Sequence, residues 1–174
     1  YKDPADKIYA DVRSREGIEE VSLRGLNLKV FPGVYPPQQF RSTLFALDNI
    51  APLTKGKVVC EIGCGTGVLG LYCLDQGVSR VIMSDINPSA ALNAKENKKL
   101  NAWDDDHLSV YQGDCFENVP KQIFDIIVWL MPYHSDEIQI KDPLQQAFYD
   151  PGFRSLKKFL SEAKHYSTPN TDVL

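Results

Sequence analysis

From Lys57 onward, short apolar runs alternate with longer stretches in which apolar residues recur at helical spacing. This alternation predicts parallel strands joined by right-handed helical crossovers. The run at 58–62 is apolar except for Glu61, as expected of a strand that is buried on both faces. Strands are expected at 58–62, 80–84, 108–112, 124–130 and 171–174.

Helices are expected between these strands. Residues 67–76 have the apolar periodicity of a largely buried helix, and Gly77 is placed to end it. Asn87 followed by Pro88 is typical of a helix start, and this second helix is expected to run to residue 100. Three of its residues are expected to face inward: Ala91, Leu92 and Ala94.

The two ends of the chain are less regular. Helical periodicity returns at 153–166, after a segment at 131–152 that contains three prolines and is expected to be irregular. Upstream of the alternating region, 21–31 indicates a small hairpin and 38–50 a helix. These short elements form an N-terminal arm in front of the alternating region.

Together the elements predict an α/β fold that is Rossmann-like and doubly wound. It has a mainly parallel sheet, helices on both faces and a short N-terminal arm of hairpin and helix. We expect the arm to comprise residues 1–50 and the core residues 51–174. Because the chain starts with Tyr1 rather than Met and stops at Leu174 in the last expected strand, we expect an incomplete C-terminus and a larger parent protein.

Composition and charge narrow the possible partners. Hydrophobic residues make up 43% of the chain and charged residues 24%, which is ordinary for a globular domain. The net charge of -4 gives no strong nucleic-acid signature. A lysine cluster at Lys95, Lys98 and Lys99 is expected on a solvated helix face. No apolar run approaches the ~20 residues that span a bilayer, so no membrane partner is expected.

The cysteines indicate a reducing environment. There are four, Cys60, Cys64, Cys73 and Cys115, without a C-x-x-C pair or a histidine at zinc spacing. We expect reduced thiols in or beside the core and no metal site. With no signal-peptide pattern at the N-terminus, a cytoplasmic protein is expected.

The turn after the first core strand carries the strongest chemical signal. It runs Glu61-Ile-Gly-Cys-Gly-Thr-Gly67. In open parallel sheets the first strand-to-helix turn is the usual ligand cradle, and glycines there expose the backbone to the ligand. The helix that follows directs its N-terminal N–H groups toward the same place.

Two kinds of ligand compete for this turn. Gly65, Gly67 and Gly70 fit the G-x-G-x-x-G fingerprint of dinucleotide binding, with Asp85 at a suitable distance. However, Glu61 would place a carboxylate beside a pyrophosphate, with unfavourable electrostatics. A cationic or zwitterionic ligand is a better match.

The turn resembles the first motif of class I S-adenosylmethionine-dependent methyltransferases, which is an acidic residue followed by x-G-x-G-x-G. Within that family the chain resembles the small-domain type, a group that includes the release-factor glutamine and ribosomal-RNA guanine methyltransferases. The resemblance implies that S-adenosylmethionine is the cofactor. It also implies that the turn lies beside the cofactor's methionine part, through Glu61, Gly63, Cys64, Gly65 and Gly67.

Two further motifs of that family match. Asp85 closes the second core strand, and the resemblance implies that it accepts hydrogen bonds from both ribose hydroxyls while Ile86 packs on the adenine. Asp85 acting only as a helix cap is the alternative, although Asn87 already supplies a cap. After the third strand, Asp114 is expected to meet the adenine amino group and the Cys115 backbone to meet the ring.

The segment 31–37, Phe-Pro-Gly-Val-Tyr-Pro-Pro, resembles the family's region in front of the core. There it closes over the cofactor, so Tyr35 and Pro37 are candidate lid contacts. A proline-rich turn that merely leads into a helix is the alternative.

The fourth motif departs from the family pattern. In amino-group methyltransferases it is Asn or Asp, then Pro or a similar residue, then Pro and an aromatic residue, whereas here it is Leu-Met-Pro-Tyr at 130–133. Pro132 and Tyr133 keep the turn and an aromatic wall, but Leu130 cannot accept a hydrogen bond from a target N–H. His134 or the Leu130 carbonyl are candidates to position the nucleophile.

Three functions remain open at this point. The first is an active methyltransferase that acts on an unidentified acceptor in protein, RNA or a small molecule. The second is a methyltransferase-like module that binds the cofactor or a partner and transfers nothing, which Leu130 and the early stop both favour. The third is a nucleotide-dependent oxidoreductase, which rests only on the overlapping glycines.

Overall fold

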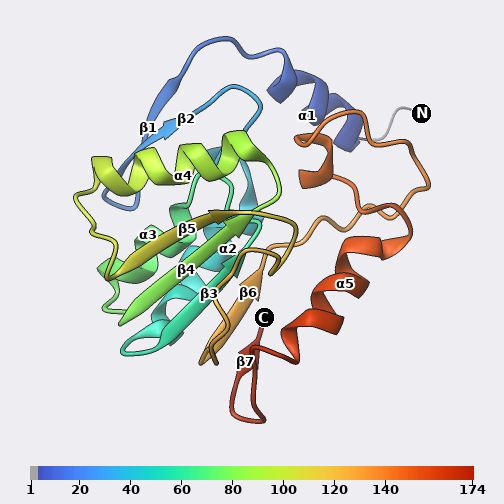
Figure 1. Ribbon diagram of the computed structural model, residues 1–174. Coiled ribbons are helices and arrows are strands. Elements are labelled where there is room, and N and C mark those ends of the chain that lie inside the picture. Colours follow the sequence, from blue (N-terminus) through green and yellow to red (C-terminus); the bar gives the residue numbers. More distant parts are fainter. Residues whose placement is uncertain (1–3) are drawn as a thin grey trace.

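The computed structural model describes residues 4–174, and a five-stranded sheet forms its centre (Figure 1). All strands pair in parallel, in the order β5-β4-β3-β6-β7. They are β3 (Val58–Ile62), β4 (Arg80–Asp85), β5 (Leu108–Gln112), β6 (Ile126–Trp129) and β7 (Asp172–Val173). The order reverses between β3 and β6, so the doubly wound α/β fold is confirmed.

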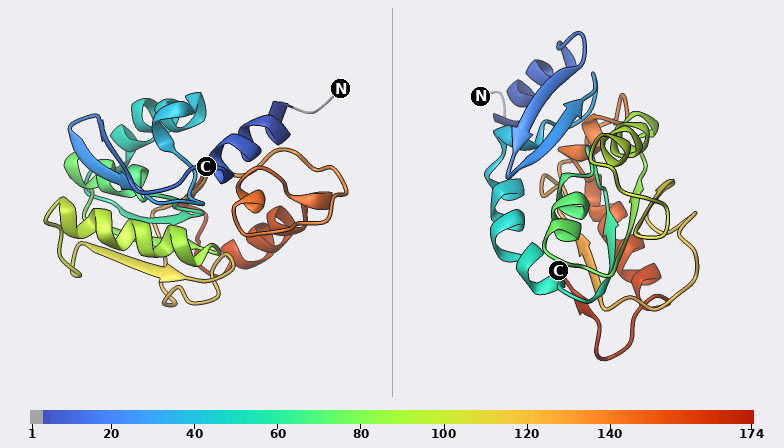
Figure 2. Two further views of the ribbon diagram at one scale, coloured as in Figure 1. Left: turned by 90° about the horizontal axis from the view of Figure 1, so that it is seen from above. Right: turned by 90° about the vertical axis from the view of Figure 1, so that its left-hand side faces the viewer.

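Helices cover both faces of the sheet (Figures 1 and 2). On one face the apolar core includes Leu47, Leu71 and Ala94 from three different helices. These helices are α2 (Arg41–Asn49), α3 (Val68–Asp75) and α4 (Pro88–Leu100). The other face packs on Phe159 and Ala163 of α5 (Arg154–Ala163). Two short 3₁₀ turns, η1 (Pro37–Gln39) and η2 (Ala51–Thr54), flank α2.

Helix α4 begins as predicted but buries a different set of residues. The Asn87 Oδ1 atom accepts a hydrogen bond from the Ser89 N–H at 3.0 Å, which is the expected N-cap. Leu92 is 53% exposed, so its predicted inward orientation is wrong. Lys98 was expected to be solvated, but it is buried and its ammonium group pairs with Asp105.

The N-terminal hairpin is attached to α4 by a row of asparagines. It consists of β1 (Glu19–Leu23) and β2 (Leu26–Val30), paired antiparallel. The Asn97 Oδ1 accepts from the Lys29 N–H at 2.7 Å, and the Asn93 Nδ2 donates to the Lys29 carbonyl at 2.7 Å. One turn further along α4, the Asn101 Nδ2 donates to the Asn27 carbonyl at 2.8 Å. These hydrogen bonds satisfy backbone N–H and C=O groups on the unpaired edge of β2, and they hold the hairpin on the core.

The sequence analysis missed the helix α1 (Pro4–Arg13). Its apolar side chains Ala5, Tyr9 and Val12 pack with Leu144 and Phe148 in a third core, away from the sheet. Tyr1, where the predicted arm begins, lies outside the described residues. Figures 1 and 2 show α1 beside the segment that follows β6.

Segment 131–152 is irregular, as predicted, with two short 3₁₀ turns, η3 (Gln145–Ala147) and η4 (Pro151–Phe153). Two hydrogen bonds connect it to α1. The Tyr9 hydroxyl donates to Asp142 Oδ2 at 2.6 Å, and the Tyr149 hydroxyl donates to Asp6 Oδ1 at 2.9 Å. Parts of the chain that are far apart in sequence therefore form one cover over the end of the sheet.

Candidate active site

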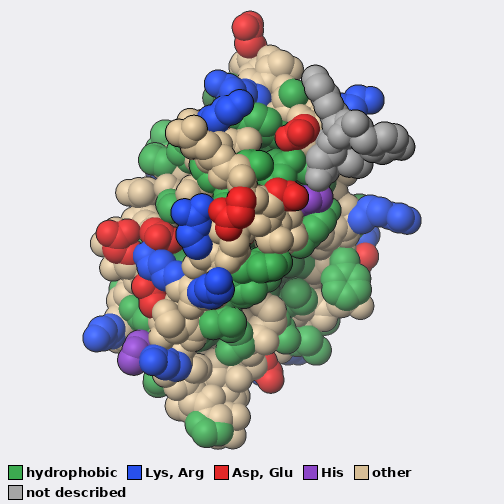
Figure 3. All heavy atoms as spheres, turned by 90° about the vertical axis from the view of Figure 1, so that its right-hand side faces the viewer, with side chains coloured by type: hydrophobic (Ala, Val, Ile, Leu, Met, Phe, Trp, Pro, Cys, Tyr) green, Lys and Arg blue, Asp and Glu red, His purple; other side chains and the backbone are tan. Residues whose placement is uncertain are grey.

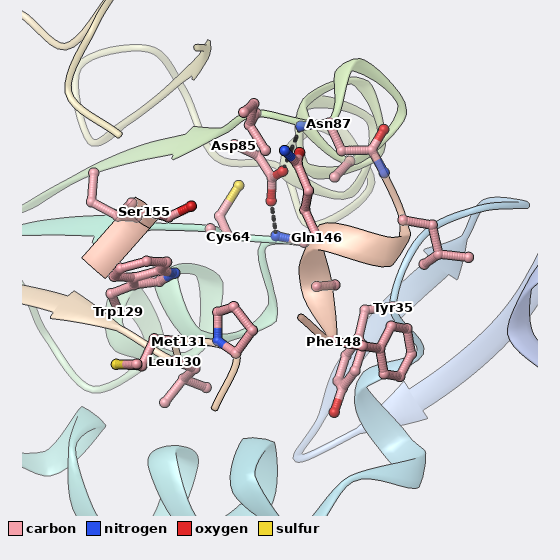
Figure 4. A pocket seen from close by; sticks show the side chains of 18 of the residues that line it. Tyr35, Cys64, Asp85, Asn87, Trp129, Leu130, Met131, Gln146, Phe148 and Ser155 are labelled. Carbon is pink, nitrogen blue, oxygen red and sulfur yellow. Dashed lines mark hydrogen bonds between the residues drawn. The ribbon is translucent and has the colours of Figure 1, made fainter. Parts of the chain in front are cut away.

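A cavity of about 640 Å³ opens at the carboxyl ends of the central strands (Figure 4). Cavities of this size hold whole cofactors or drug-sized ligands. Every predicted site residue except Gly67 lines it: Tyr35, Pro37, Glu61, Gly63, Cys64, Gly65, Asp85, Ile86, Asp114, Cys115, Leu130, Pro132, Tyr133 and His134. The structure thus brings together residues that the sequence spreads over a hundred positions.

The three glycines of the turn have different surroundings. All have a left-handed backbone, with φ of 66° at Gly63, 57° at Gly65 and 80° at Gly67. A Cβ on Gly65 would meet nothing within 4 Å, so this residue presents open backbone to the cavity. A Cβ on Gly67 would lie 3.1 Å from Ala94 Cβ. Gly67 therefore allows α3 to pack on α4 instead of lining the cavity.

Asp85, the last residue of β4, holds the turn in place. Its Oδ2 accepts from the Gly65 N–H and its Oδ1 accepts from the Asn87 N–H, both at 2.8 Å (Figure 4). Burial raises the pKa of Asp85, and the two backbone hydrogen bonds counteract that shift because they stabilise the carboxylate. Asp85 thus connects the glycine turn to the start of α4.

Glu61 lies under the turn and has a partner that the sequence did not suggest. Its Oε2 accepts from the Gly70 N–H at 3.0 Å. A Cβ on Gly70 would lie 2.6 Å from Met83 Sδ and 3.0 Å from Glu61 Oε2, so glycine is required there by packing. Gly70 is the third glycine of the apparent dinucleotide fingerprint. Its packing accounts for a glycine at this position, so no pyrophosphate ligand is needed to explain it.

Burial raises the pKa of Glu61 to about 8, with a smaller contribution from nearby Asp85. The hydrogen bond from Gly70 lowers the pKa but does not compensate for burial. At neutral pH and without ligand, the folded protein therefore keeps Glu61 protonated.

We expect Glu61→Gln to stabilise the ligand-free protein progressively as pH rises from 4.5 to 8. In this window the unfolded chain releases the Glu61 proton and the folded chain retains it, so wild-type stability falls by about 1.4 kcal/mol per pH unit. Glutamine does not titrate and can still accept from Gly70. Urea unfolding at pH 5 and pH 8.5 measures the difference, and an equal difference at both pH values would contradict the protonated state.

The far wall at β5 contains an ion pair. The Lys158 Nζ of α5 lies 2.6 Å from Asp114 Oδ2, and this carboxylate raises the pKa of Lys158 against the opposing effect of burial. Cys115, the next residue, is a free buried thiol whose pKa is raised chiefly by burial. All four cysteines are free and buried, which confirms the prediction of unpaired core thiols.

The strand-end segment 130–134 varies in exposure, with Pro132 buried between two exposed residues, Leu130 and Tyr133. Leu130 is 38% exposed and Tyr133 is 75% exposed, although both also line the cavity. The Tyr133 and His134 rings lie 4.6 Å apart, and the His134 carbonyl accepts from the Asp150 N–H at 2.8 Å. Leu130 places an apolar side chain at the position where the family motif has a hydrogen-bonding one.

Sequence reasoning missed an aromatic wall. The Tyr35 and Phe40 rings stack at 3.7 Å, and Phe148 lies 5.4 Å from Tyr35. Trp129 forms part of the opposite side, where Gly63 lets its indole pass (Figure 4). The helical spacing of the apolar residues in α1 could have revealed the cover over this wall.

The outer face formed by α1, segment 131–152 and α5 has apolar side chains near its centre and charged side chains mostly around them (Figure 3). None of the helices in residues 4–174 combines the length and the apolar character needed to span a bilayer.

Comparison with known proteins agrees with this geometry. A family model described as "Methyltransferase small domain" matches residues 25–159. A Methanocaldococcus jannaschii protein, provisionally named protein N5-glutamine methyltransferase, is 35% identical over 84% of this chain and 73% of its own length. The release factor glutamine methyltransferase of Aquifex aeolicus is 35% identical over 67% of this chain and 42% of its own.

A solved structure agrees as well. The Trypanosoma brucei PRMT1 enzyme-prozyme complex with AdoHcy matches with a TM-score of 0.57 and 26% identity over 76% of this chain and 37% of that one. The chain therefore spans less than half of the PRMT1 chain and of the Aquifex protein.

The parallel sheet, the glycine turn and these matches define the class: S-adenosylmethionine-dependent methyltransferases, with S-adenosylmethionine as cofactor. The chain belongs to the methyltransferase small-domain family.

Proposed function

We propose that this chain binds S-adenosylmethionine across the glycine turn and transfers its methyl group to an acceptor held against the segment 130–134. The residues fit the cofactor on charge and on shape. Glu61, Asp85 and Asp114 line the cavity and no Lys or Arg does among the described lining residues. Acidic residues suit a ligand with positive sulfonium and ammonium groups, and these charges would favour the ionised form of Glu61, which is protonated without ligand. Gly65 leaves open backbone for close approach.

The roles of individual residues follow from their places. Asp85 would accept from the ribose hydroxyls, because each of its oxygens has a lone pair left beside its one backbone hydrogen bond. Ile86 and Cys115 would flank the adenine, and Asp114 would accept from its amino group. Glu61, Gly63, Cys64 and Gly65 would surround the methionine part. Gly67 would act indirectly, because it allows α3 to pack on α4.

Residues 1–50 would form the lid and 51–174 the catalytic core. Tyr35 and Pro37 line the cavity from the lid side, and the asparagine contacts of α4 keep the hairpin in place. When bound, S-adenosylmethionine supplies an activated methyl carbon. The chain's own contribution is to align the acceptor and exclude water, which is most of what such a transfer requires.

At the acceptor side, Pro132 and Tyr133 would form a wall, and the Leu130 carbonyl or His134 would position the nucleophile. Two relatives are named for the methylation of protein glutamine, so a protein is one acceptor to test. The side chain of Leu130 offers a carboxamide no hydrogen bond. Four unpaired cysteines favour a reducing compartment such as the cytoplasm.

The proposal predicts that methyl-labelled S-adenosylmethionine incubated with a cell lysate and the wild-type protein labels one acceptor fraction. The Asp85→Ala variant should label none, because it would not retain the cofactor at the same concentration. Scintillation counting of protein, RNA and small-molecule fractions measures the transfer.

A chain that binds the cofactor but labels no fraction would be a binding module instead. Leu130→Asn separates these outcomes further. A gain of amino-group methylation would indicate a decayed site, and a loss of existing transfer would show that Leu130 suits a different acceptor.

A further inference from the structure

Acidic side chains are distributed unevenly around the cavity. Among the described residues that line it, Glu61, Asp85 and Asp114 are the only Asp or Glu, and they lie at or just beyond the ends of β3, β4 and β5. We call the remaining part, formed by α1, Tyr35, Phe40 and the segment 130–148, the acceptor chamber. Its described lining residues include no Asp, Glu, Lys or Arg. A charged ligand there would lose its hydration without meeting a carboxylate, ammonium or guanidinium group of the described lining residues.

Most of the side chains that line the acceptor chamber are apolar or aromatic, and His134 and Gln146 are polar exceptions. The rings of Tyr35 and Phe148 lie together on one side of the cavity, and Leu130 and Met131 lie on the other (Figure 4). Phe40 stacks on Tyr35 and extends the aromatic surface. Aromatic rings prefer to pack against other rings in offset or edge-to-face arrangements. A planar ligand therefore has matching surfaces here.

Helix α1 covers one part of the chamber, while its rim at Leu130 and Tyr133 is exposed to solvent. Ala5 and Ile8 of α1 line it from above the wall, and the hydrogen bonds from Tyr9 to Asp142 and from Tyr149 to Asp6 hold α1 against the segment after β6. A polypeptide or nucleic acid would need room for backbone on both sides of the inserted group. A small molecule needs only space for itself.

We propose, on the basis of the methyl transfer proposed above, that the acceptor is an uncharged aromatic or heteroaromatic small molecule bound whole in the acceptor chamber. A carboxamide fits less well, because its two N–H donors would face the side chains of Leu130 and Met131. A ring presents apolar faces to these residues and needs a hydrogen bond only at its nucleophilic atom.

The transfer balances for such a ring. A lone pair on a ring or substituent heteroatom forms the bond to the methyl carbon, and the carbon–sulfur bond breaks with its electron pair remaining on sulfur. A proton on the acceptor atom is released to water at the exposed rim near Tyr133. The products are a thioether and a methylated ring, which is neutral when the acceptor atom has released a proton and carries the positive charge of the former sulfonium when the atom had no proton to release.

The test uses three probes of similar shape and different charge. Quinoline is neutral at pH 7.5, 1-methylquinolinium is a cation and quinoline-2-carboxylate is an anion. We expect calorimetry on the protein saturated with S-adenosylhomocysteine to show quinoline binding about tenfold or more tightly than either charged probe. Equal binding of the three probes, or tighter binding of a charged one, would overturn the proposal.

Two variants locate the binding. Phe148→Ala should weaken quinoline binding about tenfold and weaken S-adenosylhomocysteine binding much less, since Phe148 reaches the cofactor side only through its contact with Tyr35. Phe45→Ala is the matched control, because Phe45 is 63% exposed on α2 and does not line the cavity. Ala147→Glu adds a carboxylate at an exposed lining position without disturbing packed side chains, and it should shift the preference toward 1-methylquinolinium.

The outcomes separate the two proposals. If the wild-type protein does not bind S-adenosylhomocysteine, the proposed methyl transfer fails. If it binds S-adenosylhomocysteine but Phe148→Ala leaves quinoline affinity unchanged, the acceptor class alone is wrong. Label from S-adenosylmethionine recovered in protein or RNA rather than in small molecules would also overturn the acceptor class.

Discussion

Replacing Asp85 by alanine is expected to weaken S-adenosylmethionine binding by about 2–4 kcal/mol, which is roughly a 30-fold to 700-fold rise in Kd. The variant loses the proposed charged acceptor for two ribose hydroxyls, and such charge-assisted hydrogen bonds are the stronger kind. It also leaves the Gly65 and Asn87 N–H groups without their carboxylate partner. Isothermal titration calorimetry measures the change.

Two controls make the result specific. Asp75→Ala removes an exposed carboxylate at the end of α3 that does not line the cavity, so its affinity should equal that of the wild type. Asp85→Asn keeps one oxygen acceptor and should fall between the wild type and Asp85→Ala. Unchanged affinity in Asp85→Ala, with the fold intact by circular dichroism, would refute the ribose role.

The second large effect concerns stability rather than binding. Gly63→Ala is expected to lower the free energy of unfolding by about 2–4 kcal/mol. Its φ of 66° is unfavourable for alanine, and the new Cβ would lie 2.8 Å from Trp129 Nε1. Urea denaturation of the ligand-free variant measures the loss.

Gly65 offers a matched comparison on the same turn. A Cβ there would meet nothing within 4 Å, so Gly65→Ala should lose only the backbone contribution of about 1–2 kcal/mol. In a Trp129→Leu background, Gly63→Ala should then cost no more than Gly65→Ala, as a double-mutant cycle would show. If Gly63→Ala lowers the free energy of unfolding as much in that background as in the wild type, contact with the Trp129 indole is not the cause.

The core of the fold could be predicted because its signals are local. The run at 58–62 and the Asn87-Pro88 helix start each specify an element through neighbouring residues, and both are confirmed. Helix α1 was missed, although Ala5, Tyr9 and Val12 have helical spacing, because its partners Leu144 and Phe148 lie far away in sequence. Leu92 was wrongly expected to face inward, because an apolar residue type does not by itself fix the direction in which the side chain points.

The cofactor side of the site and the strand-end segment 130–134 followed from motifs, and the aromatic wall of the acceptor side did not. Glycines and acidic strand ends recur at fixed positions, so the sequence was enough to assign residues such as Gly65 and Asp85 to one cavity. The aromatic wall of Tyr35, Phe40 and Phe148 depends on tertiary contacts between the arm and a proline-rich segment. No local sequence pattern indicates that the arm and this segment contact each other.

The hydrogen bonds that join α1 to the segment after β6 have a consequence for folding of the nascent chain. They connect residues 133 and 143 positions apart, so the helix leaves the ribosome long before Asp142 and Tyr149 are synthesised. At ordinary translation speeds this interval is on the order of ten seconds. During that time the apolar stripe of α1 is uncovered and open to chaperones, and a nascent chain that stalls before residue 142 cannot yet enclose an acceptor.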